Sequence, residues 1–124
     1  MTARFRGLSP MLRTADIQAT IQFYESVLGF ECTGFNEDWG WASLEREGIT
    51  IMIASPNSHE TWEKAVFTGS LYIRLENVAE FWQKVKEKAR VCYPLETFEY
   101  GMKEFALYDN NGYLLQFGEE IAGK

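Results

Sequence analysis

Apolar side chains recur at helical spacing directly after Asp16 and stop before Gly29. An aspartate accepts hydrogen bonds from the free N–H groups of a first helical turn, and a glycine adopts the left-handed conformation that ends a helix. We therefore expect an amphipathic helix between Asp16 and Gly29, with one face buried. That face consists of Ile17, Ile21, Tyr24 and Leu28.

The same pattern returns 61 residues later (77 − 16), after Asn77. Asn77 is a suitable N-cap residue, and Glu80 three positions on completes the pattern of a capping box. We expect a second amphipathic helix here. Its apolar positions are Val78, Phe81, Trp82, Val85 and Ala89.

Strand patterns flank both helices in the same order. Residues 12–17 match residues 73–78, and Trp39-Gly40-Trp41 matches Tyr100-Gly101-Met102 at the same offset. The order strand, helix and three strands thus occurs twice, which predicts two βαβββ repeats in one α+β domain. We place the domain at residues 1–124, the repeats at about 7–55 and 70–120, and a linker at about 56–69.

Each repeat ends in a hairpin. Glu47-Gly48 leads into residues 49–54, and Asn110-Asn111-Gly112 leads into residues 113–118. Asn-Gly between two strand patterns is typical of a type I′ turn, in which both central residues have positive φ. We therefore expect that turn at Asn111-Gly112.

Alternation along the strands separates an apolar face from a mixed polar face. We expect the apolar set to pack against the helices: Leu8, Pro10, Leu12, Thr14, Ile49, Ile51, Ile53, Leu71, Ile73, Leu75, Leu115 and Phe117. The opposite set then faces a cavity: Ser9, Met11, Arg13, Thr50, Met52, Ser70, Tyr72, Arg74, Leu114 and Gln116.

Two segments of the chain resemble a known family. Residues 10–30, with Asp16, Phe23-Tyr24 and Leu28-Gly29-Phe30, look like the opening of the vicinal-oxygen-chelate superfamily, which includes glyoxalase, extradiol dioxygenases and bleomycin-resistance proteins. Residues 100–117 resemble the closing segment of bleomycin-resistance proteins, which reads Trp-Gly-x-x-Glu-Phe and then Asp-Pro-x-Gly-Asn. The departures are Tyr100 for Trp, Asn110 for Pro and Tyr113 for Asn.

The resemblance implies an incomplete barrel with helices on its convex side and a concave ligand cleft. It also implies a homodimer that forms two clefts between its subunits. Enzymes of the superfamily bind a divalent ion through His, Glu or Gln at four equivalent strand positions, which here correspond to Ser9, Met52, Ser70 and Gln116. Serine and methionine are poor ligands for such ions, so we expect no metal and no cofactor.

Other catalytic chemistry has little support in the sequence. The single histidine, His59, lies in the linker, where we expect an exposed loop residue. Ser9 and Ser70 have no histidine to activate them, and neither cysteine lies beside one. Proton transfer by Glu45 or Glu104 stays open, so whether the protein is an enzyme is undecided, with a binding protein favoured.

Aromatic and charged side chains dominate the expected cavity. By resemblance, Trp39 and Tyr100 match aromatics that stack on the drug in bleomycin-resistance proteins, although ordinary packing of Trp39 and Trp41 is the alternative. Flat aromatic walls with a few acids suit a planar, cationic or mixed-polarity ligand. The candidate ligand-binding residues are Trp39, Trp41, Tyr100, Met102, Glu104, Tyr72, Arg13, Arg74 and Gln116.

The two arginines admit two interpretations. Arg13 and Arg74 occupy equivalent positions on the polar face, where they either pair with Glu45, Glu76 or Glu104 or bind an anionic group. We favour internal pairing.

Composition narrows the partners. A net charge of −6 disfavours nucleic acid, and no apolar run is long enough to cross a membrane. Cys32 and Cys92 suit reduced thiols, and the opening residues lack a signal-peptide pattern, so we expect a cytoplasmic protein. The sequence therefore favours a metal-independent protein that sequesters a small molecule, as in antibiotic resistance. The alternative is a glyoxalase- or dioxygenase-like enzyme with an atypical metal site.

Overall fold

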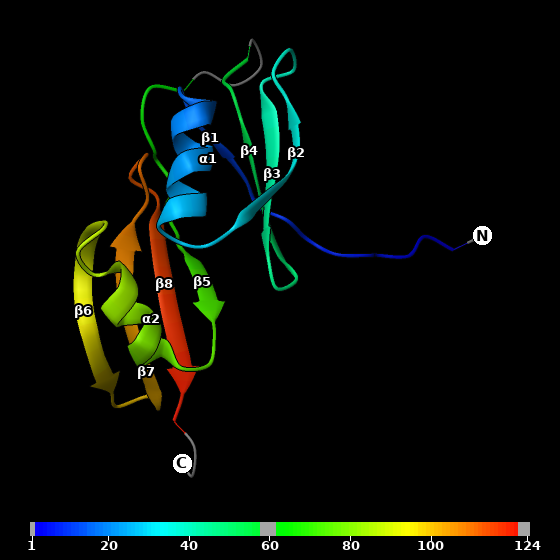
Figure 1. Ribbon diagram of the computed structural model, residues 1–124. Helices are drawn as coiled ribbons and strands as arrows, with labels where there is room; N and C mark the ends of the chain where they lie inside the picture. Colours follow the sequence, from blue (N-terminus) through cyan, green and yellow to red (C-terminus); the bar gives the residue numbers. More distant parts are fainter. Residues whose placement is uncertain (1, 58–61, 122–124) are drawn as a thin grey trace.

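The computed structural model describes residues 2–57 and 62–121, which form two modules of the same topology (Figure 1). The first module contains β1 (Met11–Arg13), α1 (Ile17–Ser26), β2 (Glu31–Asn36), β3 (Trp41–Arg46) and β4 (Ile49–Ala54). The second contains β5 (Leu71–Arg74), α2 (Val78–Val85), β6 (Arg90–Phe98), β7 (Met102–Tyr108) and β8 (Leu114–Glu120). The two predicted βαβββ repeats are confirmed.

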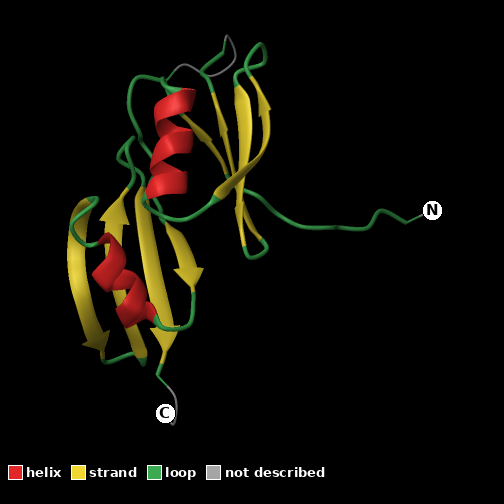
Figure 2. Ribbon diagram, in the orientation of Figure 1, coloured by secondary structure: helices red, strands yellow, loops and turns green. Residues whose placement is uncertain are grey.

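Each module carries one four-stranded sheet. The strand orders are β1-β4-β3-β2 and β5-β8-β7-β6, so the first strand of each module pairs in parallel with the last. Each helix packs on one face of the sheet of its own module, and the opposite face of each sheet is left open (Figure 2). The two sheets do not close into a barrel.

The two helix starts differ in chemistry. As predicted, the Asp16 side chain caps α1, because its Oδ1 accepts from the Ala19 N–H at 2.9 Å. The capping box at Asn77 and Glu80 was wrong. Asn77 lies in the left-handed region (φ +60°) and its side chain forms no cap. Instead Glu119 on β8 accepts from the Val78 N–H at 3.0 Å, which satisfies the first turn of α2 from outside the helix.

The hairpin turns also differ. Glu47 and Gly48 both have positive φ, at +49° and +86°, as a type I′ turn requires. The type I′ turn predicted at Asn111-Gly112 was wrong, because only Gly112 has positive φ there. The Asp109 side chain imposes a different turn, since its Oδ1 accepts from the N–H groups of three following residues. These are Asn111, Gly112 and Tyr113, at 2.9, 3.0 and 2.9 Å.

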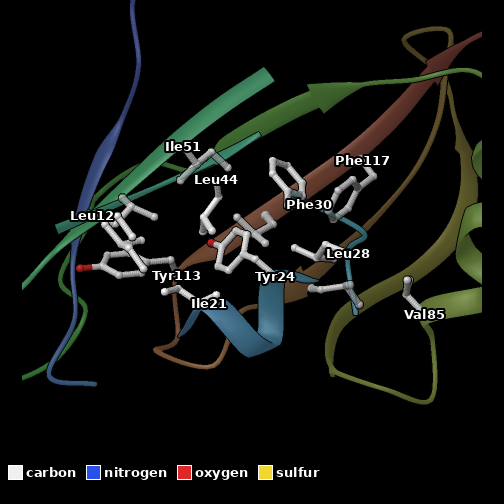
Figure 3. Close-up of a cluster of buried hydrophobic side chains, with 14 of the residues drawn as sticks. Leu12, Ile21, Tyr24, Leu28, Phe30, Leu44, Ile51, Val85, Tyr113 and Phe117 are labelled. Carbon is white, nitrogen blue, oxygen red and sulfur yellow. The ribbon is translucent and has the colours of Figure 1, made fainter. Parts of the chain in front are cut away.

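One hydrophobic core runs through both modules (Figure 3). As alternation predicts, Leu44, Ile53 and Leu115 are fully buried on the helix side of their strands. The aromatic ring of Tyr24 packs edge-on against Phe30, with centroids 5.7 Å apart. The buried cluster thus includes side chains from both modules, and the single domain stays a prediction.

The beginning of the chain departs from the expected pattern. β1 starts only at Met11, and residues 2–9 run away from the body of the molecule without strand pairing (Figure 1), whereas the Pro10 carbonyl accepts from the Met52 N–H at 2.9 Å. Leu8, which we assigned to the buried face, is 95% exposed, and Phe5 is fully exposed. Alternation places a side chain on a face only where a partner strand exists, and this segment has none within the chain. No helix among the described residues is long and apolar enough to cross a membrane.

Candidate functional site

The open face of the first sheet carries two methionines among polar side chains. Cross-strand pairing places Met11 beside Met52 and Met52 beside Ser43, in one row. The Trp41 ring lies over Gly34 on the neighbouring strand, where a Cβ atom would come within 3.2 Å of it. The Trp41 ring therefore lies against this face, in the space that Gly34 leaves by having no side chain.

Trp39 precedes the strand and lies in the turn between β2 and β3. Its backbone N–H donates to Asn36 Oδ1 at 2.9 Å, while its side chain is 78% exposed. Tyr100 occupies the matching turn of the second module and is 63% exposed. Neither ring is part of the core, so the packing interpretation does not apply to Trp39.

The open face of the second sheet centres on Glu104 of β7. The Tyr72 hydroxyl donates to Glu104 Oε1 at 2.7 Å, and the Tyr93 hydroxyl donates to Oε2. Glu104 is only 1% exposed, although it lies on the polar side of its strand. The phenols cover the carboxylate where we expected it to line an open cavity.

Further hydrogen bonds extend this cluster to β5 and β8. Gln116 Nε2 donates to the Tyr93 hydroxyl at 2.8 Å, and the Ser70 hydroxyl donates to Gln116 Oε1. The structure therefore brings three of the candidate residues, Tyr72, Glu104 and Gln116, into one hydrogen-bonded cluster. Sequence reasoning missed Tyr93, because β6 changes register on both sides of it and alternation could not be followed there.

Burial of the phenols and their contact with Glu104 raise the pKa values of the tyrosines in this cluster. Burial raises the pKa of Tyr93 to about 12, with the hydrogen bond to Glu104 adding to the effect. Burial, followed by the same hydrogen-bond partner, raises the pKa of Tyr72 well above its usual value. The pKa of Tyr100 is also raised, through slight desolvation and the proximity of the Glu104 carboxylate. All three phenols stay protonated at neutral pH, so Tyr72 and Tyr93 act as donors to Glu104.

A row of aromatic rings adjoins the carboxylate. Tyr93 meets Phe98 edge-on at 5.7 Å, and Phe98 stacks on Tyr100 at 5.4 Å with an interplanar angle of 11°. Met102 lies at the other side, where a Cβ atom on Gly118 would come within 3.1 Å of its methyl group. The same Cβ would collide with the Tyr72 hydroxyl, so Gly118 leaves the space that Tyr72 needs.

The arginines do not pair with Glu104. Arg13 donates from Nη1 to the Ser55 carbonyl at 3.1 Å. Arg74 is exposed and forms no ion pair with another described residue. The described hydrogen bonds of Glu104 come from phenols, so neither arginine is its partner there, and pairing of the arginines with Glu45 or Glu76 stays a prediction.

The metal positions of the superfamily hold a different chemistry. Ser70 and Gln116 are hydrogen bonded to each other, Met52 offers only a thioether, and Ser9 lies before β1 on the exposed arm. Such a set does not suit a divalent ion. Within residues 2–57 and 62–121, no group of three His, Cys, Asp or Glu side chains could hold one. His59 lies outside the described residues.

Two hollows in the surface lie away from these faces. They measure about 750 and 570 Å³ and meet around Arg46 and Phe81, where the two modules adjoin. Of the predicted ligand-binding residues only Arg74 lines either of them. Arg46 fills part of the space, since it donates to the Leu28 carbonyl at 2.6 Å and covers the Phe81 ring at 5.4 Å. We therefore place the candidate site on the open sheet faces, where the polar cluster and the exposed aromatics lie.

The predicted site residues fall into two groups on different sheets. Trp39, Trp41 and Arg13 belong to the first module. The second module carries Tyr72, Arg74, Tyr100, Met102, Glu104 and Gln116. Within the described chain, no strand of one sheet pairs with a strand of the other, and no aromatic ring contact joins the two groups.

Solved structures share the fold across nearly the whole chain. A bleomycin resistance determinant encoded on transposon Tn5 is 24% identical, with a TM-score of 0.75, covering 94% of this chain and 98% of the other. A glyoxalase/bleomycin resistance protein/dioxygenase from Nocardioides is 14% identical, with a TM-score of 0.78 and coverages of 100% and 89%. A protein of unknown function from Agrobacterium tumefaciens is 20% identical, with a TM-score of 0.78 and coverages of 97% and 98%.

At these identities the likeness concerns the fold alone. No curated protein sequence matches the chain. The family model of the Glyoxalase/Bleomycin resistance protein/Dioxygenase superfamily matches residues 8–117, which include both modules. The chain belongs to the glyoxalase/bleomycin resistance protein/dioxygenase superfamily.

Proposed function

We propose that the protein binds a small molecule without a metal ion and sequesters it, in the manner of bleomycin-resistance proteins. The observation that carries the proposal is the Glu104 carboxylate, which faces the open side of its sheet and is held by phenols. Among the described residues no arginine or lysine neutralises it. A buried carboxylate beside aromatic rings favours a planar ligand that is cationic or of mixed polarity.

We also propose that the ligand lies between two copies of the chain. The aromatic side chains of the two modules belong to separate sheets, so one chain alone does not enclose a ligand with both groups. Phe5 and Leu8 on the N-terminal arm are exposed, as are Trp39 and Tyr100, and a homodimer would cover such surface. Light scattering after size exclusion tests this point, and a strict monomer at micromolar concentration would contradict it.

The alternative is an enzyme in which Glu104 serves as a general base. The phenols that donate to Glu104 leave it only 1% exposed, so abstraction of a substrate proton would require one of them to move away. This arrangement supports a holding role for the carboxylate in preference to proton transfer. We therefore retain sequestration as the proposal.

A thermal-shift screen tests the function directly. The panel contains bleomycin-type drugs, small aromatic metabolites and divalent ions, because any ligand that binds only the folded state raises the unfolding midpoint. We expect stabilisation by an aromatic cationic compound and none by the ions. Incubation followed by mass spectrometry then distinguishes the two functions. Recovery of unaltered ligand supports sequestration, whereas turnover that disappears in Glu104→Gln contradicts it.

A further inference from the structure

The hydrogen bonds around Glu104 run in one direction. Ser70 donates to Gln116, Gln116 donates to Tyr93, and Tyr93 donates to one oxygen of Glu104. Tyr72 donates to the other oxygen. Since the phenols stay protonated, these directions cannot reverse without loss of the hydrogen bonds to the carboxylate.

The direction determines what the cluster offers to a ligand. A phenol hydroxyl can donate only one hydrogen bond, and the hydroxyls of Tyr72 and Tyr93 both donate theirs to Glu104. The lone pairs of Tyr72, and those of Ser70 at the start of the chain of hydrogen bonds, accept from no other described residue. Tyr72 is 38% exposed, so its oxygen is accessible from the open face. The accessible groups of the cluster are thus mainly acceptors, polarised by a negative charge directly behind them.

The cluster is built on paired strands and is hydrogen bonded without a ligand. Tyr72, Gln116, Ala106 and Tyr93 lie in one row across four strands, in which Ala106 is fully buried. The absence of a Cβ atom at Gly118 lets the Tyr72 hydroxyl lie close to the backbone of β8. Acceptors held in place in this way bind a donor without an ordering cost in the protein.

We infer that the Tyr72–Glu104–Tyr93 cluster binds a protonated primary or secondary amine of the ligand, through its N–H groups. Phe98 and Tyr100 then contact the aromatic or aliphatic part that carries the amine. This inference rests on the proposed binding function and narrows it. The site recognises N–H donors on a cation, so a quaternary ammonium group without N–H, or a neutral alcohol, is a poor substitute.

Four probes with one naphthalene ring test the inference on the full-length protein. They are 2-naphthylmethylammonium, its N,N,N-trimethyl analogue, 2-naphthylmethanol and 2-naphthoate, with affinities measured by titration calorimetry. We expect the primary ammonium to bind at least about tenfold more tightly than the trimethyl compound and the alcohol, because hydrogen bonds to charged groups are of that strength. The carboxylate should bind most weakly.

Variants locate the preference. In Glu104→Gln and in Tyr72→Phe the advantage of the ammonium over the alcohol should fall to less than about threefold. Glu96→Gln is the matched control, because Glu96 lies directly opposite Glu104 on β6 and is exposed. It removes the same charge from the same face without a phenol contact, and the preference should survive.

The possible results are distinct. Equal binding of all four probes would overturn the inference and leave the binding function standing. A preference for the ammonium that persists in both Glu104→Gln and Tyr72→Phe would place the amine elsewhere, which also overturns it. Failure of every probe to bind the wild-type protein would contradict the proposed function itself.

Discussion

The Tyr24 hydroxyl donates a 2.7 Å hydrogen bond to Oδ2 of Asp109, and so joins the helix of the first module to the turn between the last two strands of the second. Both side chains are buried, Tyr24 completely and Asp109 to within 6% exposure. Burial raises the pKa of both groups. For Asp109, hydrogen bonds from Tyr24 and from three backbone N–H groups offset part of this rise. One carboxylate thus forms the turn and also attaches it to the other module.

Removal of this link should lower stability. We expect Tyr24→Phe to reduce the free energy of unfolding by about 1–3 kcal/mol, because the buried Asp109 carboxylate loses the hydrogen bond from the Tyr24 hydroxyl. The measurement is urea denaturation followed by fluorescence. Tyr108→Phe is the control, since Tyr108 donates only to Cys92 Sγ at an exposed site. Equal losses in the two variants would contradict a special role for the buried pair.

The cap that Glu119 places on α2 should make stability depend on pH. The Val78 N–H, followed by that of Asn77, holds the pKa of Glu119 below its usual value. A depressed pKa in the folded state means stabilisation above the unfolded value of about 4.3, lost as the pH falls through the folded value. Glu119→Gln should therefore be less stable than wild type at pH 7, with the gap closing in acid. Glu120→Gln, one residue on, should show no such pH-dependent gap.

Gly118 should tolerate no side chain while Tyr72 is present. We expect Gly118→Ala to cost about 1–3 kcal/mol of stability, as overpacking does, and to weaken amine binding. A double-mutant cycle with Tyr72→Leu measures the cause. The cost of Gly118→Ala should shrink in the Tyr72→Leu background, because the clashing ring is gone. Strictly additive effects would show that Gly118 serves another purpose.

The exposed rings should matter for binding and little for folding. We expect Trp39→Ala and Tyr100→Ala each to weaken binding by about 1–3 kcal/mol, as truncation of an aromatic anchor does. Their unfolding free energies should stay near that of wild type. Ligand should also quench tryptophan fluorescence, and less so in Trp39→Ala. Phe67→Ala, an exposed aromatic outside the sheets, is the control. Unchanged affinity in both test variants would remove these rings from the site.

The purified protein should contain no stoichiometric divalent ion. Ser70 and Gln116 are hydrogen bonded to each other, and the Met52 thioether is a soft ligand that binds hard divalent ions poorly. Elemental analysis is the measurement, supported by a melting temperature that does not change with added zinc or nickel. About one bound ion per chain would contradict the prediction.

Much of the fold could be predicted because local patterns and tertiary contacts agree. The two segments that carry the family resemblance include Tyr24 and Asp109, which bond to each other, so these motifs report how the modules join. Asp16 caps its own helix, and a local pattern therefore identified it. Glu119 caps a helix that begins 41 positions earlier in the chain, and no local pattern could reveal that.

The site was only partly predictable for a related reason. Alternation correctly put Glu104 and Gln116 on the open face, because β7 and β8 pair without a break. Tyr93 escaped because bulges in β6 shift the alternation, although its ring supplies one of the two donors to Glu104. The sequence does not show which side chains lie within hydrogen-bond distance of Glu104 in the folded sheet. Tyrosines on neighbouring strands reach it, whereas the arginines do not.

Alternate residues of β7 face opposite sides of the sheet, one set in the core and the other on the open face. Phe105 and Leu107 face the helix and belong to the core, while Met102 and Tyr108 point to the open face. Under the proposed binding function, exchange of the outward residues would alter which compound binds and would leave the core side of the strand unchanged. The insertion of one residue in this strand would do the opposite, because it would reverse both sides at once. Under that proposal, point substitutions in β7 could change the bound compound, whereas a change in strand length would also disrupt the core.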